Sequence, residues 1–158
     1  MIDIIFAIKL VHLLGAAVLF GTGLGIAFFM FMAHRSGRAE IVAAVARIVV
    51  IADFLFTASA VIVQPVSGFA LAWTLGLTPL REPWIVASLA LYVVVGLCWL
   101  PVVFIQIRIR DLARAAAANG EALPADYRRL YRIWFWLGWP AFAGVIAIFA
   151  LMIWQPRF

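Results

Sequence analysis

Four long and largely apolar stretches dominate the chain, at positions 4–33, 48–75, 84–107 and 130–154. A helix needs about 20 apolar residues to cross the hydrocarbon core of a bilayer, and each stretch reaches that length. Hydrophobic residues make up 68% of the 158 residues and charged residues only 12%, so a soluble domain of this size could not cover its apolar surface. The sequence therefore predicts an all-α membrane protein in which residues 1–158 form one four-helix transmembrane bundle.

The basic residues predict how this bundle is oriented. Nine of the twelve Lys and Arg lie in two segments, 35–47 and 108–132, which connect the first stretch to the second and the third to the fourth. The positive-inside rule makes both segments cytoplasmic, so both termini are expected on the periplasmic side of a bacterial inner membrane. The net charge of +5 predicts contact with anionic lipid head groups at these segments and requires no nucleic-acid partner.

The first stretch contains two ionisable side chains, Lys9 and His12, near its N-terminal end. They are three residues apart, so a helix places them about 60° apart on one face, which we expect to point into the bundle. A buried neutral imidazole needs a partner from another helix or from a ligand. Gln64 of the second stretch lies at a comparable depth and is expected to line the same pocket. An ordinary interhelical hydrogen bond is the alternative for both residues.

The second stretch carries one polar stripe. At 100° per residue its polar side chains fall within about 40° of one direction, and they are Asp53, Thr57, Gln64 and Ser67. An acidic residue inside the membrane usually faces the protein interior or water, so this stripe predicts a path for a proton or small ion. Pairing of Asp53 with Arg47 is the structural alternative. Pro65 is expected to leave the carbonyl of Val61 without its helical donor.

The third stretch repeats this pattern, and the segment after it contains turn residues. The polar and amphipathic side chains that share one face are Ser88, Tyr92, Trp99 and Gln106. We expect this face to contact other helices and not lipid. Asn119-Gly120 predicts the end of the third helix, and Pro124 predicts the restart. The single cysteine, Cys98, excludes an intramolecular disulfide.

Several short strings resemble a family of bacterial integral membrane proteins grouped as domain of unknown function 2269. The resemblance spans almost the whole chain, and four of the strings that carry it are Lys9-x-x-His12-x-x-Gly15, Phe20-Gly-Thr-Gly-x-Gly25, Gln64-Pro-x-x-Gly68 and Trp134-Phe-Trp-Leu-Gly-Trp-Pro140. This family implies four helices and no defined activity.

More remotely, Lys9-x-x-His12 at the start of a first helix is similar to the HemJ-type protoporphyrinogen oxidases and the CopD-type copper-resistance membrane proteins. In the HemJ type, the histidine at the position of His12 is implicated in binding b-type haem, and a lysine early in the third helix is needed for activity. The corresponding residues 84–88 contain no lysine here, so the sequence departs from the oxidase pattern and leaves open whether the chain is an enzyme.

The HemJ resemblance implies haem b with His12 as a metal ligand and Lys9 near a propionate. His34 lies about 33 Å further along the same helix and cannot be the second ligand. The second axial ligand would be Met152 or a residue of a second protomer, or the sixth position of the iron would stay open. Met152 is a candidate because cytochromes also use thioether ligands. The remaining residues expected to line this site are Gln64, Tyr92 and Trp99.

Three functional hypotheses therefore stay open from the sequence. The first is a haem-binding or redox-associated protein that depends on His12. The second is a proton or small-ion carrier or channel that uses the Asp53 stripe, and the third is a non-catalytic membrane subunit. The spacing Gly21-x-x-x-Gly25 adds a further question, because such a pair permits close helix packing either within the chain or in a homodimer.

Overall fold

The computed structural model describes residues 2–156 and consists of long helices. In chain order these are α1 (Ile2–Ser36), α2 (Ala39–Ala52), the π-helix η1 (Asp53–Thr57), α3 (Ala58–Thr74), the short 3-10 helix η2 (Pro79–Arg81), α4 (Pro83–Asn119) and α5 (Ala125–Trp154). Four helical segments are long and apolar enough to cross a membrane: 3–36, 39–74, 83–119 and 125–154. The predicted all-α fold with four transmembrane helices is confirmed.

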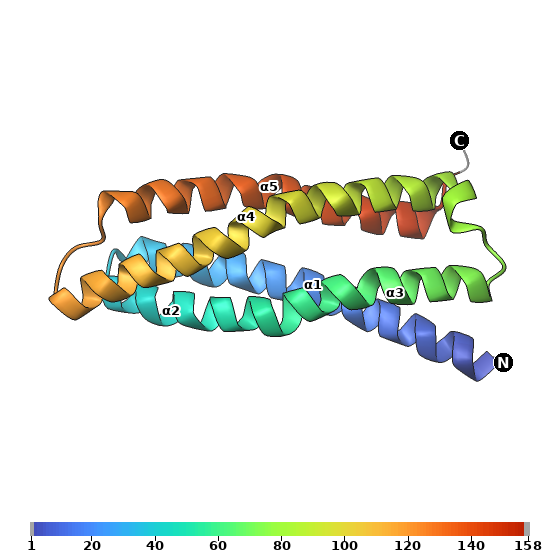
Figure 1. The fold of residues 1–158 in the computed structure, drawn as a ribbon, viewed down its shortest axis with the longest axis horizontal. Coiled ribbons are helices and arrows are strands. Elements are labelled where there is room, and N and C mark those ends of the chain that lie inside the picture. The colour runs from blue at the N-terminus through green and yellow to red at the C-terminus, as the bar shows by residue number, and fades with distance from the viewer. Residues whose placement is uncertain (1, 157–158) are drawn as a thin grey trace.

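The four spans run alternately up and down, so both ends of the chain lie at the same end of the bundle (Figure 1). We call this the terminal end; it also holds η2. The opposite end holds the two connections at residues 37–38 and 120–124, with arginines on either side of them, and we call it the basic end. The side of the membrane that each end faces stays a prediction.

Local sequence explains where the helices stop. Gly37 and Gly120 adopt φ of +67° and +65°, the left-handed conformation that glycine allows without a Cβ clash, and the chain reverses direction there. Pro83 occupies the first position of α4, where its missing N–H costs nothing. Helix α5 begins directly after Pro124. The second span differs from the sequence prediction, because its helix already begins at Ala39 and continues without a break through the region expected to be a connecting segment.

The tightest core lies toward the basic end, where all four spans contribute side chains. Its largest fully buried members are Met30 of α1, Val42 of α2, Ile109 of α4 and Tyr127 of α5. Elsewhere large apolar side chains such as Ile4 and Leu97 point outward, at 62% and 65% exposure. Outward apolar side chains are what a bilayer requires, since lipid replaces water around the spans.

The glycine pair of α1 has no close neighbour from another helix on its Cβ side among the described residues. A Cβ on Gly21 would meet nothing within 4 Å, and one on Gly25 would meet only Phe29 of the same helix, at 3.7 Å. The pair is therefore not used for packing within the described residues. A homodimer through this face stays a prediction.

Candidate functional site

Asp53 is the acidic residue placed deepest in the bundle, with 3% of its surface exposed. It begins the π-helix η1, a widened turn between α2 and α3. Such turns are rare and occur frequently at functional sites, because they displace side chains from the regular helical positions. Residues 53–57 contain neither glycine nor proline, so sequence reasoning had no signal for this irregularity.

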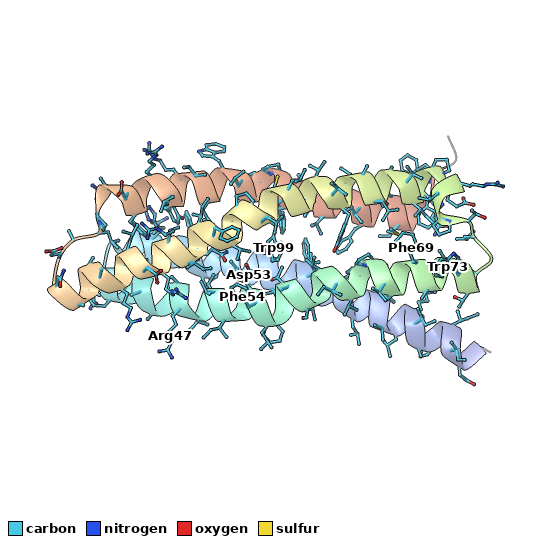
Figure 2. The ribbon with its side chains drawn as sticks, viewed as in Figure 1. Arg47, Asp53, Phe54, Phe69, Trp73 and Trp99 are labelled. Atoms are coloured by element: carbon cyan, nitrogen blue, oxygen red, sulfur yellow. The ribbon has the colours of Figure 1, made fainter. Side chains whose placement is uncertain are left out.

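Two hydrogen bonds connect Asp53 to α4, and a third links Gln106 of α4 to α5. The indole Nε1 of Trp99 donates to Oδ1 of Asp53 over 3.2 Å. The side-chain amide of Gln106 is oriented so that both its nitrogen and its oxygen form hydrogen bonds. The nitrogen donates to Oδ2 of Asp53 over 3.1 Å, and the oxygen accepts from Nε1 of Trp134 over 3.2 Å. Asp53 and Trp99 face each other between the helices, and Arg47 lies on the outside of the bundle (Figure 2). The Gln106 and Trp134 partners are residues that sequence reasoning did not assign to this site.

No positive charge compensates the Asp53 carboxyl among the described residues. The ion pairs found within residues 2–156 are Arg38 with Glu40 and Arg110 with Asp111, so the alternative pairing of Asp53 with Arg47 is wrong. The neighbouring Thr57 is also buried, and its Oγ1 has no partner in the described part of the chain. Asp53 is thus held by neutral donors alone. Its inward direction, and that of Thr57, confirms the predicted orientation of the stripe.

A second polar cluster surrounds His12 toward the terminal end. Nδ1 of His12 lies 2.9 Å from Oγ of Ser67, which is itself buried. The amide nitrogen of Gln64, oriented by the same criterion as Gln106, lies 2.9 Å from the backbone oxygen of His12 and 3.2 Å from its Nδ1. A Cβ on Gly68 would lie 3.2 Å from Cε1 of the imidazole, so glycine lets the ring approach α3. His12 and Gln64 thus lie at the same depth and contact each other, whereas a pocket lined by both stays a prediction.

The polar stripe is therefore divided into two clusters, which we name the Asp53 cluster (Asp53, Thr57, Trp99, Gln106 and Trp134) and the His12 cluster (His12, Gln64 and Ser67). Asp53 and Gln64 are eleven residues apart, about 16 Å along a helix. Tyr92 of α4 lies between the clusters and donates its hydroxyl to the carbonyl of Val61. This is the carbonyl that Pro65 deprives of its helical donor, as the sequence predicted.

The residues expected around a haem are not gathered around His12. Lys9 is exposed, which corrects the expectation that it shares the inward face; a long lysine side chain near a helix end extends toward the membrane surface. Trp99 belongs to the Asp53 cluster, and Tyr92 bonds to Val61. Met152 is half-buried on α5 near the terminal end.

A third group of polar side chains lies in the core at the basic end. Nδ1 of His34 lies 3.0 Å from the hydroxyl of Tyr127, and its ring stacks on Tyr131 with 3.7 Å between ring centres and 10° between ring planes. The hydroxyl of Tyr131 is buried without a partner among the described residues. Residues 2–156 contain no group of three or more His, Cys, Asp or Glu that could hold a metal ion.

Comparison with known proteins identifies one family. No curated protein and no solved structure matches the chain. The family model described as "Predicted integral membrane protein (DUF2269)" matches residues 6–156, in agreement with the four apolar helices. The description names no activity. Because the match covers nearly the entire chain, the protein belongs to the DUF2269 family of integral membrane proteins.

Proposed function

We propose that this integral membrane protein binds a proton at Asp53 and carries protons along the polar face of its second span. The observation that supports this proposal is the burial of Asp53 among neutral donors, with no cationic side chain paired to it in residues 2–156. An uncompensated carboxylate away from water is costly, and binding of a proton removes that cost. A buried carboxyl that binds a proton can serve as one site of a path for proton transfer.

The donors around Asp53 favour a proton over a metal ion. Magnesium and calcium bind six or more oxygen ligands, usually with several carboxylates or carbonyls. Trp99 and Gln106 direct N–H groups at Asp53, and these repel a cation. A proton needs only the carboxyl itself and a neighbouring acceptor or donor. The hydroxyl of Thr57, buried and unpartnered among the described residues, is one such neighbour.

The His12 cluster supplies the next exchangeable groups in the direction of the terminal end. Nδ1 of His12 lies near the hydroxyl of Ser67, which can donate or accept, and near the Gln64 amide nitrogen, which only donates. An imidazole in such surroundings can hold its proton on either nitrogen, which is the property of a proton shuttle. Tyr92 adds a hydroxyl between the two clusters.

Haem b ligated by His12 is the prediction of the HemJ resemblance, and it stays a prediction. The Cε1 edge of the ring lies against Gly68, and Nδ1 is near Ser67. An iron ligand would therefore be Nε2. An absorption spectrum of the purified protein tests this prediction directly: a Soret band that His12→Ala abolishes would establish haem and replace the proton-carrier proposal.

Proton transport is tested with the full chain in sealed vesicles that contain a pH-sensitive dye. With an imposed pH gradient and valinomycin to balance charge, the wild-type protein is expected to dissipate the gradient faster than protein-free vesicles. Asp53→Asn should reduce the rate to that of protein-free vesicles. Asp3→Asn is the matched control, because Asp3 is exposed at the start of α1, and its rate should equal the wild-type rate. Equal rates for Asp53→Asn and wild type would refute the proposal.

Proton binding at Asp53 has its own measurement. Infrared difference spectra between high and low pH should show the C=O stretch of a protonated carboxyl in the wild type and in Asp3→Asn, at a frequency typical of a nonaqueous environment. Asp53→Asn should lack this band. A wild-type protein that shows no such band would contradict proton binding at Asp53, whatever the transport assay shows.

A further inference from the structure

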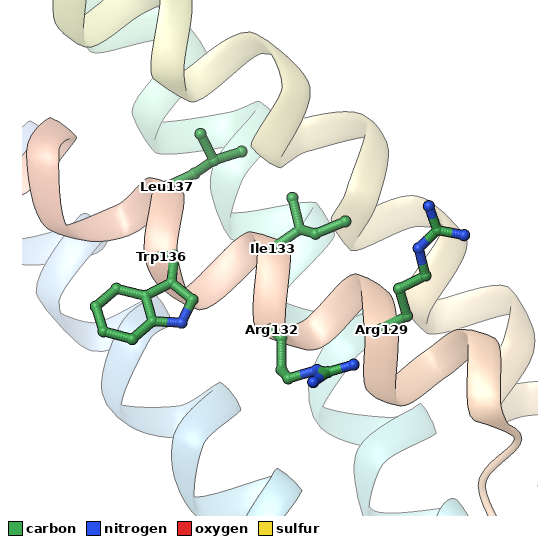
Figure 3. Close-up of a pocket in the computed structure, with 5 residues that line it drawn as sticks. All are labelled: Arg129, Arg132, Ile133, Trp136 and Leu137. Carbon is green, nitrogen blue, oxygen red and sulfur yellow. The ribbon is translucent and has the colours of Figure 1, made fainter.

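One face of α5 changes from charged to apolar along the helix axis, starting at the basic end. Arg129 and Arg132 come first, and Ile133, Trp136 and Leu137 follow toward the middle of the span (Figure 3). These positions are spaced i, i+3, i+4, i+7 and i+8, so a helix places them on one side. They line an open groove of about 510 Å³.

A second groove of about 320 Å³ continues from the first toward α4. Arg129 and Ile133 line both grooves, and the second adds Arg108 and Leu112 of α4. Three arginines therefore line the two grooves, with Arg129 shared between them, and the carboxylate of Asp126 is the acidic group that lines the second groove. None of the three arginines takes part in an ion pair within the described residues, so their charge is available to an anion.

We propose that these joined grooves bind the phosphate of an anionic phospholipid, with its acyl chains along the apolar part of α5. Guanidinium groups bind phosphate oxygens through paired N–H donors, which suits Arg108, Arg129 and Arg132. Nearer the middle of the span, Trp136 and Ile133 are 69% and 41% exposed and so are available to acyl chains. A phospholipid has the same order of groups along the membrane normal, first the charged phosphate and then hydrocarbon.

The apolar half of the groove distinguishes a lipid from a soluble phosphate. A free phosphate would use the arginines alone, whereas a lipid also covers Trp136 and Leu137. Tryptophan is enriched at membrane interfaces because its ring is apolar and its N–H is polar, so Trp136 is suited to the boundary between head group and chain. The site is separate from Asp53, and its occupation does not depend on proton transport.

Native mass spectrometry of the full chain, taken from nanodiscs that contain phosphatidylcholine and phosphatidylglycerol, tests the proposal. The wild-type protein is expected to retain phosphatidylglycerol in preference to phosphatidylcholine. The double variant Arg129→Gln/Arg132→Gln should weaken the retention of phosphatidylglycerol by about thirtyfold, which corresponds to about 1 kcal/mol for each arginine. Millimolar inorganic phosphate should leave the lipid bound.

The matched control is Arg47→Gln/Arg114→Gln, which removes the same charge from two exposed positions outside the grooves. It should change retention by less than about twofold. Equal losses in the two double variants would mean diffuse attraction to a basic surface and would overturn the site. An absence of preference in the wild type, or displacement by inorganic phosphate, would overturn it as well. All four substituted residues are exposed, and unchanged circular dichroism verifies that each variant is folded.

Discussion

The carboxylate of Asp53 on η1 accepts a hydrogen bond from the indole nitrogen of Trp99 on α4, over 3.2 Å. The two residues come from different spans and lie 46 positions apart in the chain. Their contact brings an acidic group and a neutral donor together inside the membrane region, where an unpaired polar group costs more free energy than at a surface. The stability of the bundle should therefore depend on this contact.

Replacement of Asp53 by asparagine and by leucine should have different effects on stability. Asparagine keeps a carbonyl oxygen that accepts from Trp99 and removes an uncompensated carboxyl, so we expect the free energy of unfolding to change by less than about 1 kcal/mol. Leucine leaves the donors of Trp99 and Gln106 without a partner and should cost about 1–3 kcal/mol. Denaturant unfolding in detergent measures both values, and a larger loss for asparagine than for leucine would contradict the described contacts.

Gly144 of α5 should tolerate no side chain. A Cβ at this position would lie 2.6 Å from Cγ2 of Val95 on α4, and valine has little rotamer freedom in a helix with which to move away. Gly144→Ala is therefore expected to reduce the free energy of unfolding by about 1–3 kcal/mol. Gly138→Ala on the same helix, where nothing lies within 4 Å, is the control and should be neutral or slightly stabilising. Equal midpoints of thermal unfolding would refute the close packing of α4 on α5.

The two tyrosines at the basic end should respond differently to loss of the hydroxyl. Tyr127→Phe removes the hydrogen-bond partner of His34 and is expected to cost about 1 kcal/mol. Tyr131→Phe removes a buried hydroxyl that has no partner among residues 2–156, so the free energy of unfolding should stay equal or rise. Both variants keep the aromatic ring, which stacks on His34 at position 131 and is tilted against His34 at position 127. The opposite order of stabilities would show that the hydroxyl of Tyr131 is satisfied.

Reporter fusions test the orientation of the bundle. The positive-inside rule predicts that the connection at residues 120–124 is cytoplasmic and that the C-terminal end is periplasmic. Alkaline phosphatase fused after Phe158 should then be active, and green fluorescent protein inserted after Gly120 should fluoresce. The reverse result would place the termini in the cytoplasm, while leaving both at the same end of the bundle, as in Figure 1.

The amino-acid sequence by itself determined the number of spans, most of their ends and the inward direction of their polar stripes. These features depend on local chemistry. An apolar stretch of sufficient length has no stable place outside a membrane, Gly120 and Pro124 stop and restart a helix, and polar side chains such as Asp53 and Gln106 avoid lipid. The contact of His12 with Gln64 also followed from the sequence, because depth along two antiparallel helices can be counted from their ends.

Only the tertiary structure decided which polar groups meet. Asp53 bonds to Trp99 and Gln106 and not to Arg47, and the predicted stripe is divided between two clusters. Helical periodicity gives the direction of a side chain on its own helix, but the rotation and shift of one helix against another come from packing of the whole interface. The π-helix at residues 53–57 adds a local widening that no residue pattern announced. Small shifts of one helix against another decide which polar groups become hydrogen-bond partners, because a hydrogen bond forms only within about 3 Å.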